Sequence, residues 1–206
     1  MSKKIKRLKN PSIIEFVEKK STFIGYSTFV KNEEEALEII KQKKKEYQDA
    51  MHNVYAYMIG ENIARYSDDN EPQGTAGMPV LNAIRMSGIS DVLVVVTRYF
   101  GGILLGAGGL VRAYSTAASI SLNSAQTVVF EDYRVLKIEC SYSDYGRLST
   151  EISQIDAIVD SSDFSDTVCI KFAIKEEIAD SFIATIIDIF NGRIVPKFIE
   201  NRIDCK

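Results

Sequence analysis

The spacing of apolar and polar residues predicts two consecutive α+β units in this chain. Strands are expected where apolar residues alternate or run together, and helices where they recur every three or four positions. In the first unit this predicts, in chain order, strands at 12–19 and 21–30, a helix at 33–47, strands at 54–59 and 63–66, a short helix at 78–86, a buried strand at 92–97 and a helix at 110–125. Asn32 is the expected N-cap of the first helix, because three glutamates follow it.

The second unit is shorter, and its elements follow in the order βαββαβ. The pattern predicts a strand at 133–140, a helix at 144–155, strands at 157–161 and 167–174, a helix at 176–191 and a last strand around 194–199. This order is the split βαβ arrangement of ferredoxin-like domains. Residues 126–132 lack clear periodicity and are expected to connect two domains, 1–128 and 133–206. The predicted fold class is therefore α+β.

The segment most informative about function includes the buried strand and the glycines after it. From Val92 to Ser115 it reads VLVVVTRYFGGILLGAGGLVRAYS. A strand, a glycine turn and a helix in this order aim free amide N–H groups at an anion, and Arg98 and Arg112 flank the turn. Ala107 replaces the lysine of a Walker loop, and Val111 replaces the third glycine of a dinucleotide fingerprint. The segment predicts a site for a phosphate or another acidic partner. Tight packing of the helix on the sheet would explain the glycines equally well.

An acidic loop and a single histidine precede this segment. The loop, Ser67 to Gly77, reads SDDNEPQGTAG and carries Asp68, Asp69 and Glu71. Such carboxylates can hold a hard cation, but their spacing matches no defined pattern, and a loop that turns and caps a helix is the alternative. We therefore assign no metal and no cofactor. His52 is either a general base or a partly buried structural residue.

Composition and cysteine usage place the chain among ordinary folded proteins. Hydrophobic residues make up 46% and charged residues 26% of it. The longest apolar run, 101–111, is too short and too glycine-rich to span a bilayer, and no apolar segment of a secretory signal follows the basic start. Cys140, Cys169 and Cys205 are odd in number and widely spaced, which disfavours a disulfide framework or a metal knuckle. We expect Cys140 and Cys169 to pack in the core and the protein to be cytoplasmic.

Charge is distributed unevenly along the chain, although the net charge is only −3. Residues 1–132 carry 16 basic and 15 acidic side chains, against 9 and 13 in residues 133–206. The basic residues form two clusters, Lys3, Lys4, Lys6, Arg7 and Lys9 at the start, and Lys41 with Lys43, Lys44 and Lys45 later. Each cluster can meet phosphates or can simply be solvated, and the second also suits the C-terminal end of a helix dipole.

Together these motifs resemble the IMPACT/YigZ family. The resemblance rests on KKSTFIG at 19–25, His52, SDDNEPQGTAGMP at 67–79 and VVTRYFGGILLGAGGLVRAYS at 95–115, in this order. Phe100 stands where many members have a second Tyr, and Arg112 where a Lys is common. Both differences keep the chemical type of the side chain.

The resemblance implies a fold and a role that the residues alone do not. It implies that the first domain is a βα sandwich like the second domain of a small-subunit ribosomal protein. It implies that the second domain is ferredoxin-like and similar to the last domain of elongation factor G. The implied role is cytoplasmic regulation of translation, translational initiation included, through RNA or the ribosome. Eukaryotic relatives compete for the activator of a starvation kinase through an additional domain without a counterpart here, so that partner is not carried over.

The first hypothesis is a translation-associated binding protein rather than an enzyme. Loops that follow strands gather at one edge of βα architectures, which predicts a shared binding surface. The candidate residues for an anion, nucleic acid or partner are His52, Ser67, Asp68, Asp69, Glu71, Thr75, Arg98, Tyr99, Gly101, Gly102, Gly106, Gly108, Gly109 and Arg112. The alternative is a metal-dependent hydrolase or phosphotransferase that uses His52, Asp68, Glu71 and Arg98. A protein partner on the C-terminal sheet is a third hypothesis, and no membrane partner is expected.

Overall fold

The structure is a computed structural model that describes residues 4–205, so Lys3 of the first basic cluster lies outside it. The chain divides into two compact units, an N-terminal unit of residues 5–128 and a C-terminal unit that takes in Lys4 and residues 129–205. Residues 4–205 form five helices and ten strands in two sheets, which confirms the α+β fold class. Within this range, no helix combines the length and apolar character needed to cross a bilayer.

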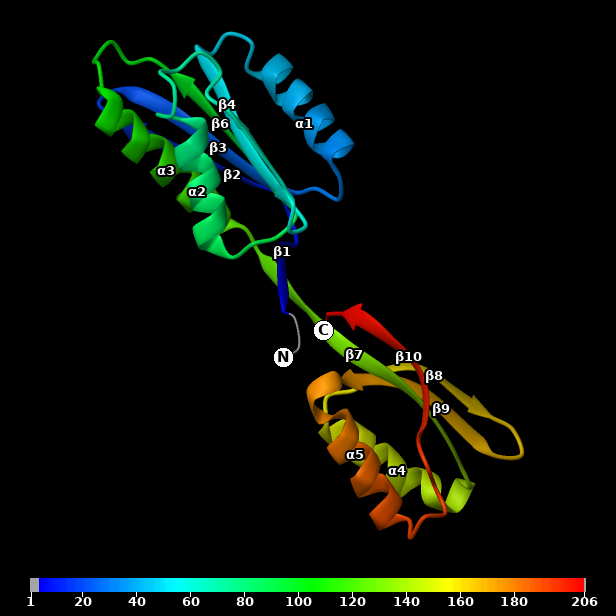
Figure 1. The fold of residues 1–206 in the computed structure, drawn as a ribbon. Coiled ribbons are helices and arrows are strands. Elements are labelled where there is room, and N and C mark those ends of the chain that lie inside the picture. The colour runs from blue at the N-terminus through cyan, green and yellow to red at the C-terminus, as the bar shows by residue number, and fades with distance from the viewer. Residues whose placement is uncertain (1–3, 206) are drawn as a thin grey trace. The chain divides into compact units, whose positions relative to one another are not determined.

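The N-terminal unit contains a five-stranded antiparallel sheet with helices on both faces, and a further strand, β1, that is not part of this sheet. Its elements are β1 (Ile5–Leu8), β2 (Ser12–Glu18), β3 (Ser21–Phe29), α1 (Glu33–Glu46), β4 (His52–Ile59), β5 (Ile63–Ser67), α2 (Gly77–Ser87), β6 (Val92–Tyr99) and α3 (Ala107–Ser124). The strand order is β2-β3-β6-β4-β5, and every neighbouring pair is antiparallel. Helices α2 and α3 cover one face and α1 covers the other (Figure 1).

Strand β6 lies at the centre of this sheet and is buried on both faces. Val92, Val94 and Val96 pack into the core beneath α2 and α3. Leu93 and Val95 point the opposite way, into the core beneath α1. Because both faces are covered, the strand is an uninterrupted apolar run rather than an alternating one. The prediction of a buried strand here is confirmed.

The first basic cluster is not a free arm, because part of it forms β1. The Ile5–Leu8 segment is a strand, and Leu8 is buried in the core. Arg7 forms an ion pair with Asp91 at 2.6 Å. Lys4 pairs with Glu131 at 2.8 Å within the C-terminal unit. Arg7 therefore belongs neither to a phosphate-binding arm nor to a solvated terminus. Its ion pair helps to hold the first strand in place.

The second basic cluster lies in the last turn of α1, where its charges suit the helix dipole. Lys43 pairs with Glu46 at 2.8 Å, and Lys44 pairs with Asp69 at 2.5 Å. At the other end, Asn32 is the N-cap as predicted, and its side chain accepts a hydrogen bond of 2.9 Å from the N–H three residues later. Two of the four lysines therefore have partners within the protein.

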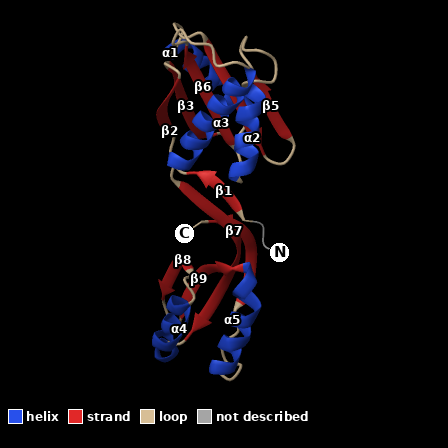
Figure 2. Cartoon of the chain, turned by 90° about the vertical axis from the view of Figure 1, so that its left-hand side faces the viewer, coloured by secondary structure: helices blue, strands red, loops and turns tan. Residues whose placement is uncertain are grey.

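The C-terminal unit has the predicted βαββαβ order. Its elements are β7 (Thr127–Cys140), α4 (Tyr142–Gln154), β8 (Ile158–Phe164), β9 (Val168–Lys175), α5 (Glu176–Ile189) and β10 (Lys197–Asp204). The strands lie in the order β10-β7-β9-β8, with antiparallel neighbours throughout. Helices α4 and α5 share a core with the strands on one face of this sheet (Figure 2). This topology is ferredoxin-like.

The segment expected to connect the two domains has regular structure. Residues 126–132 showed no clear periodicity in the sequence, and from Thr127 onward they form the first half of β7. The boundary between the two units falls after Val128, inside this strand. Thr, two Val and a Phe open the segment, and such residues favour strands even without a regular alternation.

Two other element boundaries differ from the prediction. The last strand was expected around 194–199, but it runs from Lys197 to Asp204 because Pro196, which lacks an N–H group, precedes it. Helix α3 was expected from about Leu110, but it begins at Ala107. Ala107, Gly108 and Gly109 were predicted to belong to the turn because they are small, but they form the first turn of the helix.

Candidate functional site

Three segments meet at one edge of the N-terminal sheet: the start of β4, the loop after β5 and the loop after β6. In the strand register His52 lies opposite Arg98, and Tyr55 lies opposite Ser67. Loops that follow strands were expected to gather here, but His52 begins its strand. Antiparallel pairing explains the meeting, because it brings the start of β4 beside the ends of β5 and β6.

A buried ion pair forms the floor of this edge. Arg98 Nη1 donates to Glu71 Oε1 at 2.6 Å, and the Tyr114 hydroxyl donates to the same oxygen at 2.7 Å. The Arg98 and Glu71 side chains are 6% and 3% exposed. Burial, and then the Glu71 carboxylate, raise the pKa of Tyr114 far above its ordinary value. Arg98 was predicted as an anion ligand, and Glu71 already neutralises its charge.

His52 lies at the margin of this buried cluster. Its Nδ1 is 2.8 Å from the carbonyl oxygen of Asp69, which can only accept, so Nδ1–H is the donor. In the neutral ring Nε2 is then the acceptor, and it lies 3.7 Å from Glu71 Oε1. The ring is mostly buried, and the Asp69 carbonyl sets its orientation. This places Nε2 where a ligand at the edge of the cluster could reach it.

Asp68 caps α2 from outside the helix. Its Oδ1 accepts from the N–H groups of Ala76 at 3.1 Å and Gly77 at 2.7 Å, and Oδ2 accepts from the N–H of Gly74 at 2.9 Å. The residue at the N-cap position itself makes no side-chain bond. Asp68 therefore accepts from N–H groups that have no acceptor within the helix. This matches the alternative in which the acidic loop turns the chain and caps a helix.

Asp69, Ser67 and Thr75 of the loop also have partners within the protein. Asp69 accepts from the N–H of Asn53 at 2.6 Å and from Lys44 at 2.5 Å, and its own N–H donates to Ser67 Oγ at 3.2 Å. The Thr75 hydroxyl donates to a loop carbonyl at 2.6 Å. Among residues 4–205, no three His, Cys, Asp or Glu side chains are placed to hold a metal ion. The three carboxylates point to separate partners, which does not suit a hard cation.

Close packing and backbone geometry account for part of the glycine turn. A Cβ on Gly101 would lie 1.9 Å from the Lys20 carbonyl oxygen and 2.4 Å from the Ser21 nitrogen. The N–H of Gly101 donates to Ser21 Oγ at 3.2 Å. Gly102 and Gly106 have φ of +82° and +71°, a region that side chains disfavour. The turn therefore needs these three glycines whether or not it binds a ligand.

A pocket of about 420 Å³ opens where the three segments meet. Its polar lining is His52, Asn70, Glu71 and Arg98. Its rim includes apolar side chains that are unusually exposed for their size, with Leu104 at 82% and Phe100 at 40%. The first residues of α3 complete the wall. The pocket thus combines apolar walls, a neutralised ion pair and a helix N-terminus, a combination typical of ligand sites.

Several predicted site residues lie outside this pocket. Arg112 and Gly109 line a second hollow of about 220 Å³ on a neighbouring face of α3, together with Lys19. The Tyr99 hydroxyl donates to Asp49 at 2.9 Å. Among the loop residues only Glu71 of the predicted set lines the pocket. The structure brings together His52, Glu71, Arg98 and Gly106 and distributes the others around them.

Tyr114 is part of the site but is not among the residues predicted from the sequence. Its side chain is fully buried, and its ring packs edge to face against Phe23 with centroids 5.2 Å apart. A signal was present: Tyr114 lies four residues after Leu110, on the apolar face of α3. A buried Tyr hydroxyl needs a partner, and the sequence alone could not show that Glu71 supplies it.

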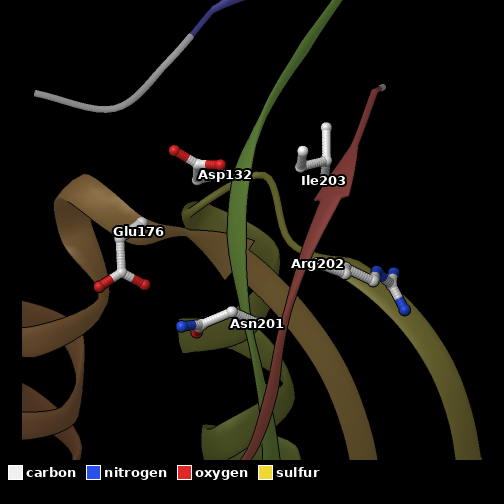
Figure 3. A pocket seen from close by; sticks show the side chains of 5 residues that line it. All are labelled: Asp132, Glu176, Asn201, Arg202 and Ile203. Atoms are coloured by element: carbon white, nitrogen blue, oxygen red, sulfur yellow. The ribbon is translucent and has the colours of Figure 1, made fainter.

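The C-terminal unit also has a pocket, of about 380 Å³, at the junction of β7, β10 and α5. Its lining side chains are those of Asp132, Glu176, Asn201, Arg202 and Ile203 (Figure 3). Arg202 points away from the two carboxylates in this view and pairs with Asp160 at 2.8 Å. Glu176 pairs with Arg134. Its charged groups join strands to one another and to α5, so we place the candidate site in the N-terminal unit.

These features define a two-unit α+β protein with a built pocket at one edge of its N-terminal sheet. Comparison with known proteins assigns its family. The family described as "Impact N-terminal domain" matches residues 19–122, and "Domain of unknown function (DUF1949)" matches residues 138–193. The chain belongs to the IMPACT family.

Individual relatives match over most of their length. "IMPACT family member YvyE" of Bacillus subtilis is 37% identical over 181 residues, which cover 87% of this chain and 83% of that protein. "IMPACT family member YigZ" of Escherichia coli is 31% identical, over 85% of this chain and 88% of that protein. A solved structure described as "Crystal structure of an hypothetical protein" is similar with a TM-score of 0.61 and 29% identity, over 96% and 98% of the two chains.

Proposed function

We propose that this chain is a cytoplasmic, translation-associated binding protein whose N-terminal unit binds RNA, ribosomal RNA included. Family membership supports the setting, since the resemblance implies a role in the regulation of translation. The observation that carries the site is the pocket in which apolar walls meet His52, Arg98 and the start of α3. Single-stranded RNA would complement both parts of this pocket, because its base faces suit apolar walls and its phosphates suit N–H donors and cations.

Electrostatics supports a small footprint on the RNA. The net charge of −3 gives the whole molecule no attraction for a polyanion. Around the glycine turn, however, Lys19, Lys20 and Arg112 are exposed, and the Lys20 backbone lies against Gly101. Three such cations would make a few phosphate contacts, which gives modest affinity with a strong dependence on salt.

The alternative of a metal-dependent hydrolase or phosphotransferase has less support. It requires carboxylate oxygens that are open to a metal, whereas Asp68 and Asp69 bond backbone amides and Lys44. Glu71 Oε1 is shared by Arg98 and Tyr114. These contacts are those of a cap and a buried ion pair, so no observation favours turnover over binding.

Salt-dependent binding tests the proposal. The full chain is titrated with a labelled single-stranded RNA and sedimented with purified ribosomes across a range of KCl concentrations. The logarithm of the association constant should fall linearly with the logarithm of salt, with a slope of about −0.7 for each phosphate neutralised on a single strand. Arg112→Ala removes about one phosphate contact, so the slope should become less negative by about 0.7. The control Lys137→Ala, on the C-terminal sheet, should leave the slope unchanged. Absence of binding to both RNA and ribosomes at low salt would refute the proposal.

A further inference from the structure

The pocket and the second hollow lie on neighbouring faces of the first turn of α3. Leu105 lines both of them. The pocket is bounded by Gly106, Ala107 and Leu110, and the second hollow by Gly109 and Arg112. One short helical turn therefore separates a largely apolar cavity from a hollow lined by two cations, Lys19 and Arg112, and one carboxylate, Glu18.

The turn between the two hollows presents backbone rather than side chains. Residues 106–109 are Gly-Ala-Gly-Gly, and a Cβ on Gly108 would meet no atom within 4 Å. The first helical hydrogen bond runs from the N–H of Leu110 to the carbonyl of Gly106 at 2.9 Å. The N–H groups of Ala107, Gly108 and Gly109 come before it and have no intrahelical acceptor. An anion can approach these amides closely, because no side chain stands in front of Gly108.

The aromatic wall of the pocket lies beside a buried cation. Arg98 lines the pocket with a side chain only 6% exposed, and its Nη1 donates to Glu71. Its Nε has no acceptor among residues 4–205 and is closed off from solvent, so it is a buried cost of the ion pair rather than a group open to a ligand. The guanidinium carbon lies 5.6 Å from the centre of the Phe100 ring, so the aromatic wall and this cation are adjacent.

We propose that a single strand of RNA crosses the first turn of α3, with one unstacked base in the pocket and its backbone over the Gly108 amide toward Lys19 and Arg112. This inference deepens the proposed function and rests on it. Phe100 and Leu104 supply apolar surface for the base, and the exposed amide of Asn70 lies at the same pocket. Unstacked bases are recognised by such stacking and by hydrogen bonds to their edges.

The inference predicts a preference that phosphate attraction alone would not produce. A base within a duplex is stacked and paired, so it cannot enter a pocket of this kind without being unpaired first. The chain should therefore bind a single-stranded oligonucleotide more tightly than the same sequence in a duplex. Phosphate contacts at Lys19 and Arg112 alone would favour the duplex, which carries the higher charge density.

The test uses the full chain and a fluorescein-labelled ten-nucleotide RNA, single-stranded or annealed, with anisotropy as the readout. Gly108→Asp places a negative charge at the crossing point, where it also favours the helix, and should weaken single-strand binding at least tenfold. Its matched control is Gly146→Asp in α4, where a Cβ also meets no atom within 4 Å and the net charge changes equally. Phe100→Ala should weaken binding about tenfold through lost stacking, and Phe198→Ala, an exposed aromatic of β10, is its control. Circular dichroism confirms that each variant is folded.

The outcomes separate this inference from the function on which it rests. Loss of binding in Gly108→Asp and Phe100→Ala, with both controls unchanged, supports the crossing. If single-stranded RNA binds but Gly108→Asp or Phe100→Ala leaves its affinity unchanged, the crossing is wrong and RNA binding itself stands. Equal or tighter binding of the duplex also overturns the crossing. If ribosomes bind while free RNA does not, the pocket contacts a protein and the inference fails. If nothing binds at low salt, both proposals are wrong.

Discussion

Glu71→Ala would remove the carboxylate that compensates a buried guanidinium. In the native protein Glu71 Oε1 accepts from Arg98 at 2.6 Å and from Tyr114 at 2.7 Å, and the Arg98 side chain is only 6% exposed. Removing one partner of a buried ion pair costs about 3–5 kcal/mol, because the other charge stays buried and unpaired. The Tyr114 hydroxyl also loses its acceptor, which adds about 1 kcal/mol. The total is a large part of the stability of about 5–15 kcal/mol usual for a domain.

The measurement must follow the N-terminal unit by itself, because two units need not unfold together. Hydrogen exchange of β6 amides, read by mass spectrometry across a urea series, reports the free energy of unfolding of this unit. Glu71→Gln is the matched variant, since it keeps an oxygen acceptor and the volume while removing the charge. Glu71→Gln should lower the free energy of unfolding by about half as much as Glu71→Ala.

A double-mutant cycle tests the reasoning behind this magnitude. Arg98→Ala alone should also cost several kcal/mol, because it leaves the Glu71 carboxylate buried. In the double variant neither charge remains, so the combined loss should be smaller than the sum of the single losses by about 2–3 kcal/mol. A loss of under about 1 kcal/mol for Glu71→Ala, or additive single losses, would show that the pair does not carry a compensated buried charge.

Four further predictions follow from particular contacts. Gly101→Ala should destabilise the N-terminal unit by about 3 kcal/mol or more through backbone collision, while Gly108→Ala should leave Tm unchanged or raise it slightly. Asp68→Ala should cost about 2 kcal/mol by uncapping α2, measured by urea unfolding, and a loss of no more than a few tenths would contradict the capping role. Because burial raises the folded pKa of Tyr114 above that of an unfolded Tyr, its contribution is full below about pH 10 and is lost as pH rises further. Tyr114→Phe should therefore flatten the alkaline fall of Tm with pH, and an unchanged slope would count against it. Burial also raises the pKa of the Cys140 thiol, so mass spectrometry of partially labelled protein should find Cys140 the slowest of the three cysteines to react with a thiol reagent.

Strong periodicity made most of the fold predictable. The hairpin of β2 and β3, the capped helix α1 and the buried strand β6 each have a local pattern that agrees with their place in the structure. Strand β1 was missed because four residues, two of them basic, give too short an alternation to distinguish a strand from a charged terminus. The start of β7 was missed because its apolar residues are consecutive rather than alternating.

The site was only partly predictable, because its roles depend on contacts between distant segments. Asp68, Asp69 and Glu71 are equivalent as a sequence pattern, yet one caps a helix, one pairs with Lys44 and one compensates Arg98. A sequence shows that a carboxylate is present but not which cation or amide it faces. The flanking arginines shared the same ambiguity, since one is buried in an ion pair and the other lies in a different hollow.

The double burial of β6 has a consequence for the thermodynamics of ligand binding. Arg98 is at the end of a strand packed on both faces, and its partners Glu71 and Tyr114 are buried with it. The floor of the pocket is therefore already ordered before any ligand arrives, and binding costs it little conformational entropy. That cost falls on the exposed wall, from Phe100 to Leu104, whose side chains must give up rotamer freedom. Substitutions in the floor should therefore weaken binding by destabilising the folded N-terminal unit. Substitutions in the wall should instead change the conformational entropy that is lost when a ligand binds.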